Sequence, residues 1–294
     1  MSLTNASSQT PSSVSTLHLY DNFDGPFLDP MKWSSPWQCG SPVMECVREI
    51  NEEALRLRVR AYGATDSSAG TQFGSSGVTL TANNVTDIAA QVVVHRSSAD
   101  GCSSNPGFGG GGGHAQFLLF GAFFNGGGGT SNDNLQAYVQ LDRYSTAPAG
   151  AVGVGGFLSY QNQFFDNVDL GFVNIGEKVT VELMWDQPNH QFVVRLFRPL
   201  LGTVAQQFMP YTVSDTTPAV GPFRNISANV YPANCLGNRT SADLDVAITK
   251  VMTNCSERRS SRHTSSVATL ALVFGNSCLG KPLIRMRIAR TFPA

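Results

Sequence analysis

The chain has little charge, and the charge that it has is unevenly distributed. Only 14% of its 294 residues are charged, against about 25% in typical soluble domains, and lysine occurs only at Lys32, Lys178, Lys250 and Lys281. Residues 254–294 carry seven basic side chains and one acidic one, so the net charge of −1 leaves about −7 on residues 1–253. Since phosphate binding needs a basic surface, we expect no nucleic-acid partner for this acidic body.

Long apolar runs are also missing. No stretch approaches the roughly 18 apolar residues of a membrane-spanning helix, so we expect no such segment. Residues 1–16 are rich in serine and threonine and lack the apolar centre of a secretory signal, which predicts a disordered leader. Residues 254–294 lose the strand-and-turn rhythm and are predicted to form a basic tail of low order.

Several catalytic motifs are absent too. The sequence contains no Glu-x-Asp-x-x-Glu strand, no Gly-x-Ser-x-Gly elbow and no phosphate-binding loop. In the nearest acidic cluster, Glu45 and Glu49 would lie about 13 Å apart on a strand, too far for retaining sugar hydrolysis. A solvated strand and turn is the favoured interpretation of that cluster, and no residue is nominated as catalytic.

The cysteines are even in number and favour disulfides over metal. None of the six forms a Cys-x-x-Cys pair. Cys39 and Cys46 flank a short turn, and a disulfide between them would close a small loop. Cys102 and Cys235 lie in Pro- and Asn-rich loops, and a bridge between these two would stabilise the fold by roughly 5 kcal/mol in the chain-entropy model. The pairing of Cys255 and Cys278 stays open. Such bridges imply an oxidising compartment; free buried thiols in a cytosolic protein are the alternative.

The apolar pattern is that of strands. Leu55, Leu57 and Val59 alternate with three arginines, which places the apolar side chains on one face of a strand. Similar signals predict further strands at 89–96, 114–124, 135–144, 151–160, 168–173, 179–197, 206–213, 224–231 and 242–251. About twelve to fourteen strands of this length suit two packed antiparallel sheets.

Two stretches carry a family resemblance. LYDNFDGPFLDPMKW (19–33) combines an aromatic strand with a Gly-Pro turn and an Asp-Pro-x-x-Trp corner, and VTVELMWDQPNHQFVVRL (179–196) has the pattern of a hairpin. Both resemble the concanavalin-like, laminin-G-like jelly roll of lectins, glycan-binding modules and polysaccharide-cleaving enzymes. The expected fold is therefore an all-β, two-sheet antiparallel jelly-roll sandwich over residues 17–253. The phrases VREINEEALRLRVRAYG and YTVSDTTPAVGPFRNISANV resemble uncharacterised bacterial secreted sandwiches, which bring no known activity.

The resemblance also implies a possible structural calcium ion. Related jelly rolls hold one between the first and last strands, and Asp24, Gly25 and Asp245 match that arrangement in position. Calcium takes six to eight oxygen ligands, more than these residues supply. The alternative is that Asp24 forms a turn and Asp245 is a charge at a strand edge.

A glycan-binding surface would combine aromatic platforms with planar polar groups. The outward candidates are Tyr138, Tyr144, Tyr160, Arg56, Arg58 and Arg60. Arginine makes bidentate contacts with carboxylates, so a uronic-acid-bearing glycan is one conceivable ligand. Packing of the tyrosines at sheet edges is the alternative.

Three functions follow from the sequence. The leading hypothesis is a non-catalytic, secreted, periplasmic or cell-surface module that recognises a glycan or another surface ligand, and we expect it to be a monomer. The alternatives are a polysaccharide-cleaving hydrolase or lyase with an atypical site, and a structural or adhesive surface protein.

Overall fold

The chain forms a two-layer β-sandwich. The structure is a computed structural model that describes residues 16–37, 44–102 and 112–255. The predicted leader and tail lie almost wholly outside the described residues. Within the described part, the only helical elements are two 3-10 turns, η1 (Ser131–Asp133) and η2 (Gln187–Asn189). The expected all-β jelly-roll sandwich of two antiparallel sheets is confirmed.

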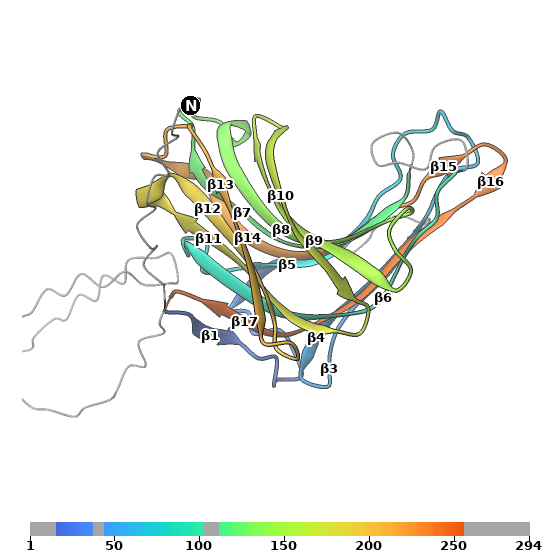
Figure 1. Ribbon diagram of the computed structural model, residues 1–294, viewed down its shortest axis with the longest axis horizontal. Coiled ribbons are helices and arrows are strands. Elements are labelled where there is room, and N and C mark those ends of the chain that lie inside the picture. The colour runs from blue at the N-terminus through green and yellow to red at the C-terminus, as the bar shows by residue number, and fades with distance from the viewer. Residues whose placement is uncertain (1–15, 38–43, 103–111, 256–294) are drawn as a thin grey trace, which may run out of the picture.

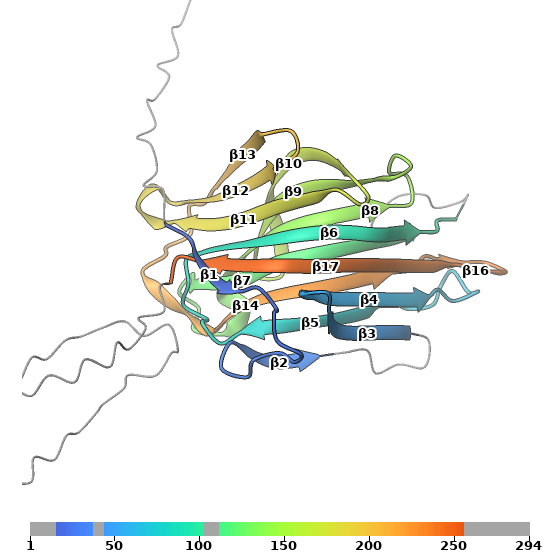
Figure 2. The same cartoon turned by 90° about the horizontal axis from the view of Figure 1, so that it is seen from below.

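The outer sheet has eight strands, seen side by side in Figure 2. Their order is β13 (Thr203–Pro210), β12 (Gln191–Arg198), β11 (Lys178–Asp186), β6 (Asp87–Ala99), β17 (Ser241–Thr253), β4 (Ala54–Tyr62) and β3 (Met44–Asn51), and β1 (His18–Asp21) pairs with the end of β17. The last strand thus pairs with the first.

The inner sheet has seven strands and bends around an open, concave side, as Figure 1 shows. Their order is β10 (Gln163–Asn174), β9 (Ala151–Tyr160), β8 (Asn134–Tyr144), β7 (His114–Asn125), β14 (Thr217–Tyr231), β5 (Gly74–Leu80) and β2 (Trp33–Trp37). A small hairpin of β15 (Asn234–Cys235) and β16 (Asn238–Arg239) extends one end of the sandwich.

Alternating side chains build the core between the sheets. Leu55, Leu57 and Val59 of β4 are at most 1% exposed, as their spacing predicts. The turn before β4 places Glu52 and Glu53 at φ values of 53° and 56°. Two consecutive residues of positive φ match the twist of a two-residue hairpin, a conformation that Asn-Gly usually supplies. The alternating pattern of the strands predicts this hairpin, whereas Glu-Glu is an unusual pair of residues for its turn.

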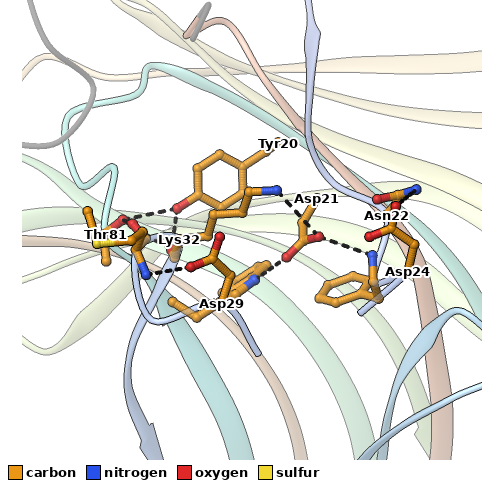
Figure 3. A network of polar contacts seen from close by, with 10 residues as sticks. Tyr20, Asp21, Asn22, Asp24, Asp29, Lys32 and Thr81 are labelled. Atoms are coloured by element: carbon orange, nitrogen blue, oxygen red, sulfur yellow. Dashed lines mark hydrogen bonds and ion pairs between the residues drawn. The ribbon is translucent and has the colours of Figure 1, made fainter. Parts of the chain in front are cut away.

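The Asp-Pro-x-x-Trp corner ties β1 to β2 (Figure 3). The indole Nε1 of Trp33 donates a 2.6 Å hydrogen bond to Asp21, whose other carboxylate oxygen accepts the backbone N–H of Phe23 at 3.1 Å. The Trp33 ring stacks on Phe23 and meets Tyr20 edge-on. The corner is therefore closed by a buried carboxylate and three packed rings.

A disulfide joins Cys102 to Cys235, as the sequence predicts, with 5.6 Å between their Cα atoms. Cys46 and Cys255 each form a disulfide as well. Cys39 and Cys278 lie outside the described residues, so the predicted pairing of Cys39 with Cys46 stays a prediction. Disulfides of this kind are consistent with a secreted or surface protein.

We expect the double variant Cys102→Ser/Cys235→Ser to lose stability. The bridge closes a loop with a sequence separation of 133 residues, and removal of a native disulfide typically costs roughly 2–5 kcal/mol. Urea unfolding followed by tryptophan fluorescence measures the change, with Ser145→Ala as the matched control. An unchanged unfolding midpoint would contradict a stabilising role for this bridge.

Candidate functional site

The concave side of the inner sheet holds a groove. Its volume is about 1190 Å³, and it is lined by strands β7 to β10, by the loop between β4 and β5, and by the residues that follow β14. The groove exists because β7, β8 and β9 each turn one face toward the core and the other toward solvent. On β8, for example, Val139 and Leu141 are at most 1% exposed, whereas the alternate residues Gln140 and Asp142 line the groove.

Two glycines keep the floor of the groove low. Gly153 and Gly155 of β9 stand opposite Asp142 and Gln140 of β8, on the groove face. A β-carbon on Gly155 would lie 2.7 Å from the carbonyl oxygen of Val168 on the neighbouring strand. Because neither glycine has a side chain, the middle of the sheet stays open between the side chains of β8 and β10.

A row of aromatic rings crosses the concave face beside the groove. Successive rings lie 5.6, 5.1, 4.2 and 5.0 Å apart between centroids, in stacked or edge-on contacts. We name this row the aromatic ladder; in strand order from β14 to β10 it consists of Phe223, Phe120, Tyr138, Phe157 and Phe164. Its last two members line the groove, and Phe164 is 71% exposed.

Asp142 is the buried acid of the groove. It is 4% exposed and pairs in register with Gln116 of β7. The Tyr144 hydroxyl hydrogen-bonds its carboxyl group and also meets Gln140, while Oδ1 of Asp142 has no hydrogen-bond partner within the described residues. Burial raises the pKa of Asp142 to about 7, because desolvation disfavours the ionised form.

The neighbouring groups are neutral at physiological pH. Burial lowers the pKa of His114 to about 4 and raises the pKa of Tyr231 to about 12. The two rings are in contact at a tilt of 48°, with 4.2 Å between their centroids, and Tyr231 hydrogen-bonds Gln116. The deep part of the groove is thus made of amides, hydroxyls, an uncharged imidazole and one readily protonated carboxyl group.

The structure divides the predicted ligand-binding residues between two sheets. Tyr144 lines the groove, Tyr138 belongs to the aromatic ladder, and Tyr160 packs on Gly126 in the turn after β7. The three arginines lie on β4 of the outer sheet, with their side chains on the strand face opposite the core.

Ion pairs occupy two of those arginines. Arg56 binds both carboxylate oxygens of Asp245 at 2.9 and 2.8 Å, and Arg58 lies 3.4 Å from Asp245 and 3.5 Å from Glu49. Glu45 accepts a hydrogen bond from Tyr62 at 2.9 Å. The outer face is therefore a network of paired charges, distant from the groove.

The predicted calcium ligands do not meet. Asp24 contacts the amide of Asn22 at 3.2 Å in the turn that contains Gly25 (Figure 3). Asp245 pairs with Arg56, and it precedes Val251, the partner of Asp21 on β1, by six residues or about 20 Å of strand. Among the described residues no group of three or more His, Cys, Asp or Glu side chains is arranged to hold a metal.

Sequence reasoning missed Gln116, Asp142, Phe157 and Phe164. Asp142 is the acidic residue of the alternating strand 135–144, at a position whose neighbours on the same face are Gln140 and Tyr144. That polar face was a usable signal. The contribution of β9 was harder to see, because its groove face is mostly glycine.

Comparisons with known proteins give only distant likenesses. No family model and no curated protein sequence matches the chain. A pseudo β-1,3-glucanase and immunostimulatory antigen of Mycobacterium tuberculosis is 14% identical with a TM-score of 0.42, over 81% of this chain and 98% of that one. Lectin II from Ulex europaeus is 14% identical with a TM-score of 0.37, over 71% and 92%. The winged bean acidic lectin, solved with methyl-α-D-galactose, is 11% identical with a TM-score of 0.37, over 81% and 98%. Likenesses this weak carry no argument about function.

In addition, no helix in the described ranges has the length and apolar character needed to cross a membrane.

The buried acid predicts a pH-dependent stability. The folded pKa of Asp142, about 7, lies above its unfolded value of about 3.9, so its stabilising effect is full below pH 4 and is lost as the pH rises through 7. Asp87, raised to about 8 by burial, acts in the same direction. For Asp142 alone we expect a loss of roughly 3 kcal/mol between pH 5 and 8.

Urea unfolding at pH 5 and pH 8 measures this loss. Asp142→Asn should be visibly less sensitive to pH than the wild type, whereas the exposed Asp169→Asn should keep the wild-type difference. Equal pH sensitivity of the wild type and Asp142→Asn would show that this carboxyl group titrates normally.

Proposed function

We propose that the protein is a secreted or surface-exposed module that binds a glycan in the groove of the inner sheet. The observation that carries the proposal is the combination of an aromatic wall, Phe157 and Phe164, with a line of amide and carboxyl groups across a glycine floor. Sugar rings present apolar C–H faces and a rim of hydroxyls, so they need both kinds of surface in one place.

The groups of the groove suit hydroxyls better than charges. Amide side chains both donate and accept hydrogen bonds. Gln116 stands opposite Asp142 on β7, and Gln140 precedes Asp142 by two residues on the same face of β8. No arginine or lysine side chain lines the groove within the described residues. A neutral glycan is therefore favoured over the uronic-acid-bearing one that the arginines of β4 suggest.

The shape of the molecule favours a binding module over a purely structural protein. A groove of this volume with convergent polar groups is the usual form of a ligand site. A purely structural protein has no need of such a groove. The exposed Phe164 and Phe172, at 71% and 52%, stand on the same strand at the groove, where they form an apolar surface open to a ligand.

The proposal is tested by affinity electrophoresis in gels that contain laminarin, galactomannan, xylan or polygalacturonate. We expect retention by at least one of the three neutral polymers. Phe157→Ala and Phe164→Ala should each weaken retention about tenfold, since removal of a central aromatic contact commonly costs more than about 1 kcal/mol.

The matched control is Phe197→Ala, which removes an exposed ring of the outer sheet (41% exposed) and should leave retention unchanged. Absence of retention on all four polymers would contradict the proposal. So would retention that survives both groove variants.

A further inference from the structure

Asp142 is unusual for a residue that only binds sugar. A buried carboxyl group normally has its oxygens hydrogen-bonded, yet Oδ1 of this 4% exposed residue has no partner within the described residues, and the side chain lines an open groove. Burial raises the pKa of Asp142 to about 7, so about half of the molecules carry this proton at neutral pH and more carry it in mild acid. Groups of this kind concentrate at catalytic sites.

A second carboxyl group lines the same groove from the other side of the glycine floor. Asp169 of β10 is exposed, and its Oδ1 accepts the backbone N–H of Gly171 at 2.8 Å. The groove thus holds one buried and one exposed carboxyl group, and two carboxyl groups in contrasting environments are the arrangement by which general acids and bases are recognised.

Strand geometry sets the separation of the two groups. Asp142 stands opposite Gly153 and Asp169 opposite Gly155, on the two sides of β9. Two strand spacings of ~4.8 Å and an offset of two residues put their Cα atoms ~12 Å apart. On a concave face the side chains converge, which brings the carboxyl groups toward the ~6.5–9.5 Å of inverting glycosidases and leaves them well beyond the ~5–5.5 Å of retaining ones.

We propose that the groove hydrolyses a glycosidic bond with inversion at the anomeric carbon, with Asp142 as the general acid and Asp169 as the general base. Asp142 gives its proton to the glycosidic oxygen as the bond from that oxygen to the anomeric carbon breaks. Asp169 takes a proton from a water molecule whose oxygen forms the new bond to the same carbon from the opposite side. Proton exchange with solvent then restores both groups.

The surroundings of Asp142 suit an acid. The titratable groups that face it are Tyr144 on its own strand, His114 on β7, Tyr231 on β14 and, across the floor, Asp169. The histidine is uncharged above pH ~4, since burial lowers its pKa to about 4, and no arginine or lysine in the described part of the chain lines the groove beside the acid. The inference rests on the proposed glycan binding, because a glycan must be bound in the groove with its glycosidic bond over the glycine floor.

The test is release of reducing ends from laminarin, galactomannan and xylan, with proton NMR to identify the first anomer formed. We expect an inverted product and a kcat/KM that falls as the pH rises through 7, where Asp142 loses its proton. Asp142→Asn and Asp169→Asn should each lower the rate by about 10²–10⁴-fold while electrophoretic retention of the polymer persists. Asp166→Asn, on β10 but outside the groove lining, is the matched control and should keep the wild-type rate.

The outcomes are separable. Retention without release overturns the catalytic inference and leaves glycan binding intact, whereas neither retention nor release removes both. A retained anomer overturns the roles given to the two acids. If Asp142→Asn fails to fold, the pH profile of the wild type and the rate of Asp169→Asn decide, and an activity insensitive to Asp169→Asn overturns the proposal.

Discussion

The fold and the groove both depend on the two-faced strands of the inner sheet. Strands β7, β8 and β9 give one face to the core between the sheets, where residues such as Phe117 and Val139 are fully buried. Their other face is then free to carry polar and aromatic side chains without weakening the sandwich. The sheet curves toward that face (Figure 1), and the side chains on it line the groove. On the solvent-facing side of the outer sheet, the charged side chains pair with one another, as Arg56 does with Asp245.

The sequence predicts the sandwich well because alternation is a local signal. Strand β9 begins and ends where its pattern predicts, and β4 places its leucines and arginines on the expected faces. Strand β14 starts seven residues before its predicted start, because a bulge between Pro218 and Phe223 interrupts the alternation of its first part. Irregular pairing of this kind depends on the neighbouring strand and leaves little trace in the chain itself.

The site was predicted less well, since it depends on which strands become neighbours. Tyr144 and Tyr138 were nominated for their outward positions on one strand, and they do lie at or beside the groove. The arginines satisfied the same criterion on β4, but that strand belongs to the other sheet. Asp142 acquires its character only when β7, β8 and β14 assemble around it, because the burial that raises its pKa is supplied by residues far away in sequence.

The disulfide between Cys102 and Cys235 lies next to one wall of the groove. Asn234, the residue before Cys235, forms part of the groove wall and fastens the loop after β4 through Ala64, Ala69 and Gly70. With the bridge reduced, this wall would rest on those hydrogen bonds and on backbone hydrogen bonds such as that from the N–H of Cys235 to the carbonyl oxygen of Ala64. The position of this wall of the groove is therefore tied to the redox state of the compartment that holds the protein.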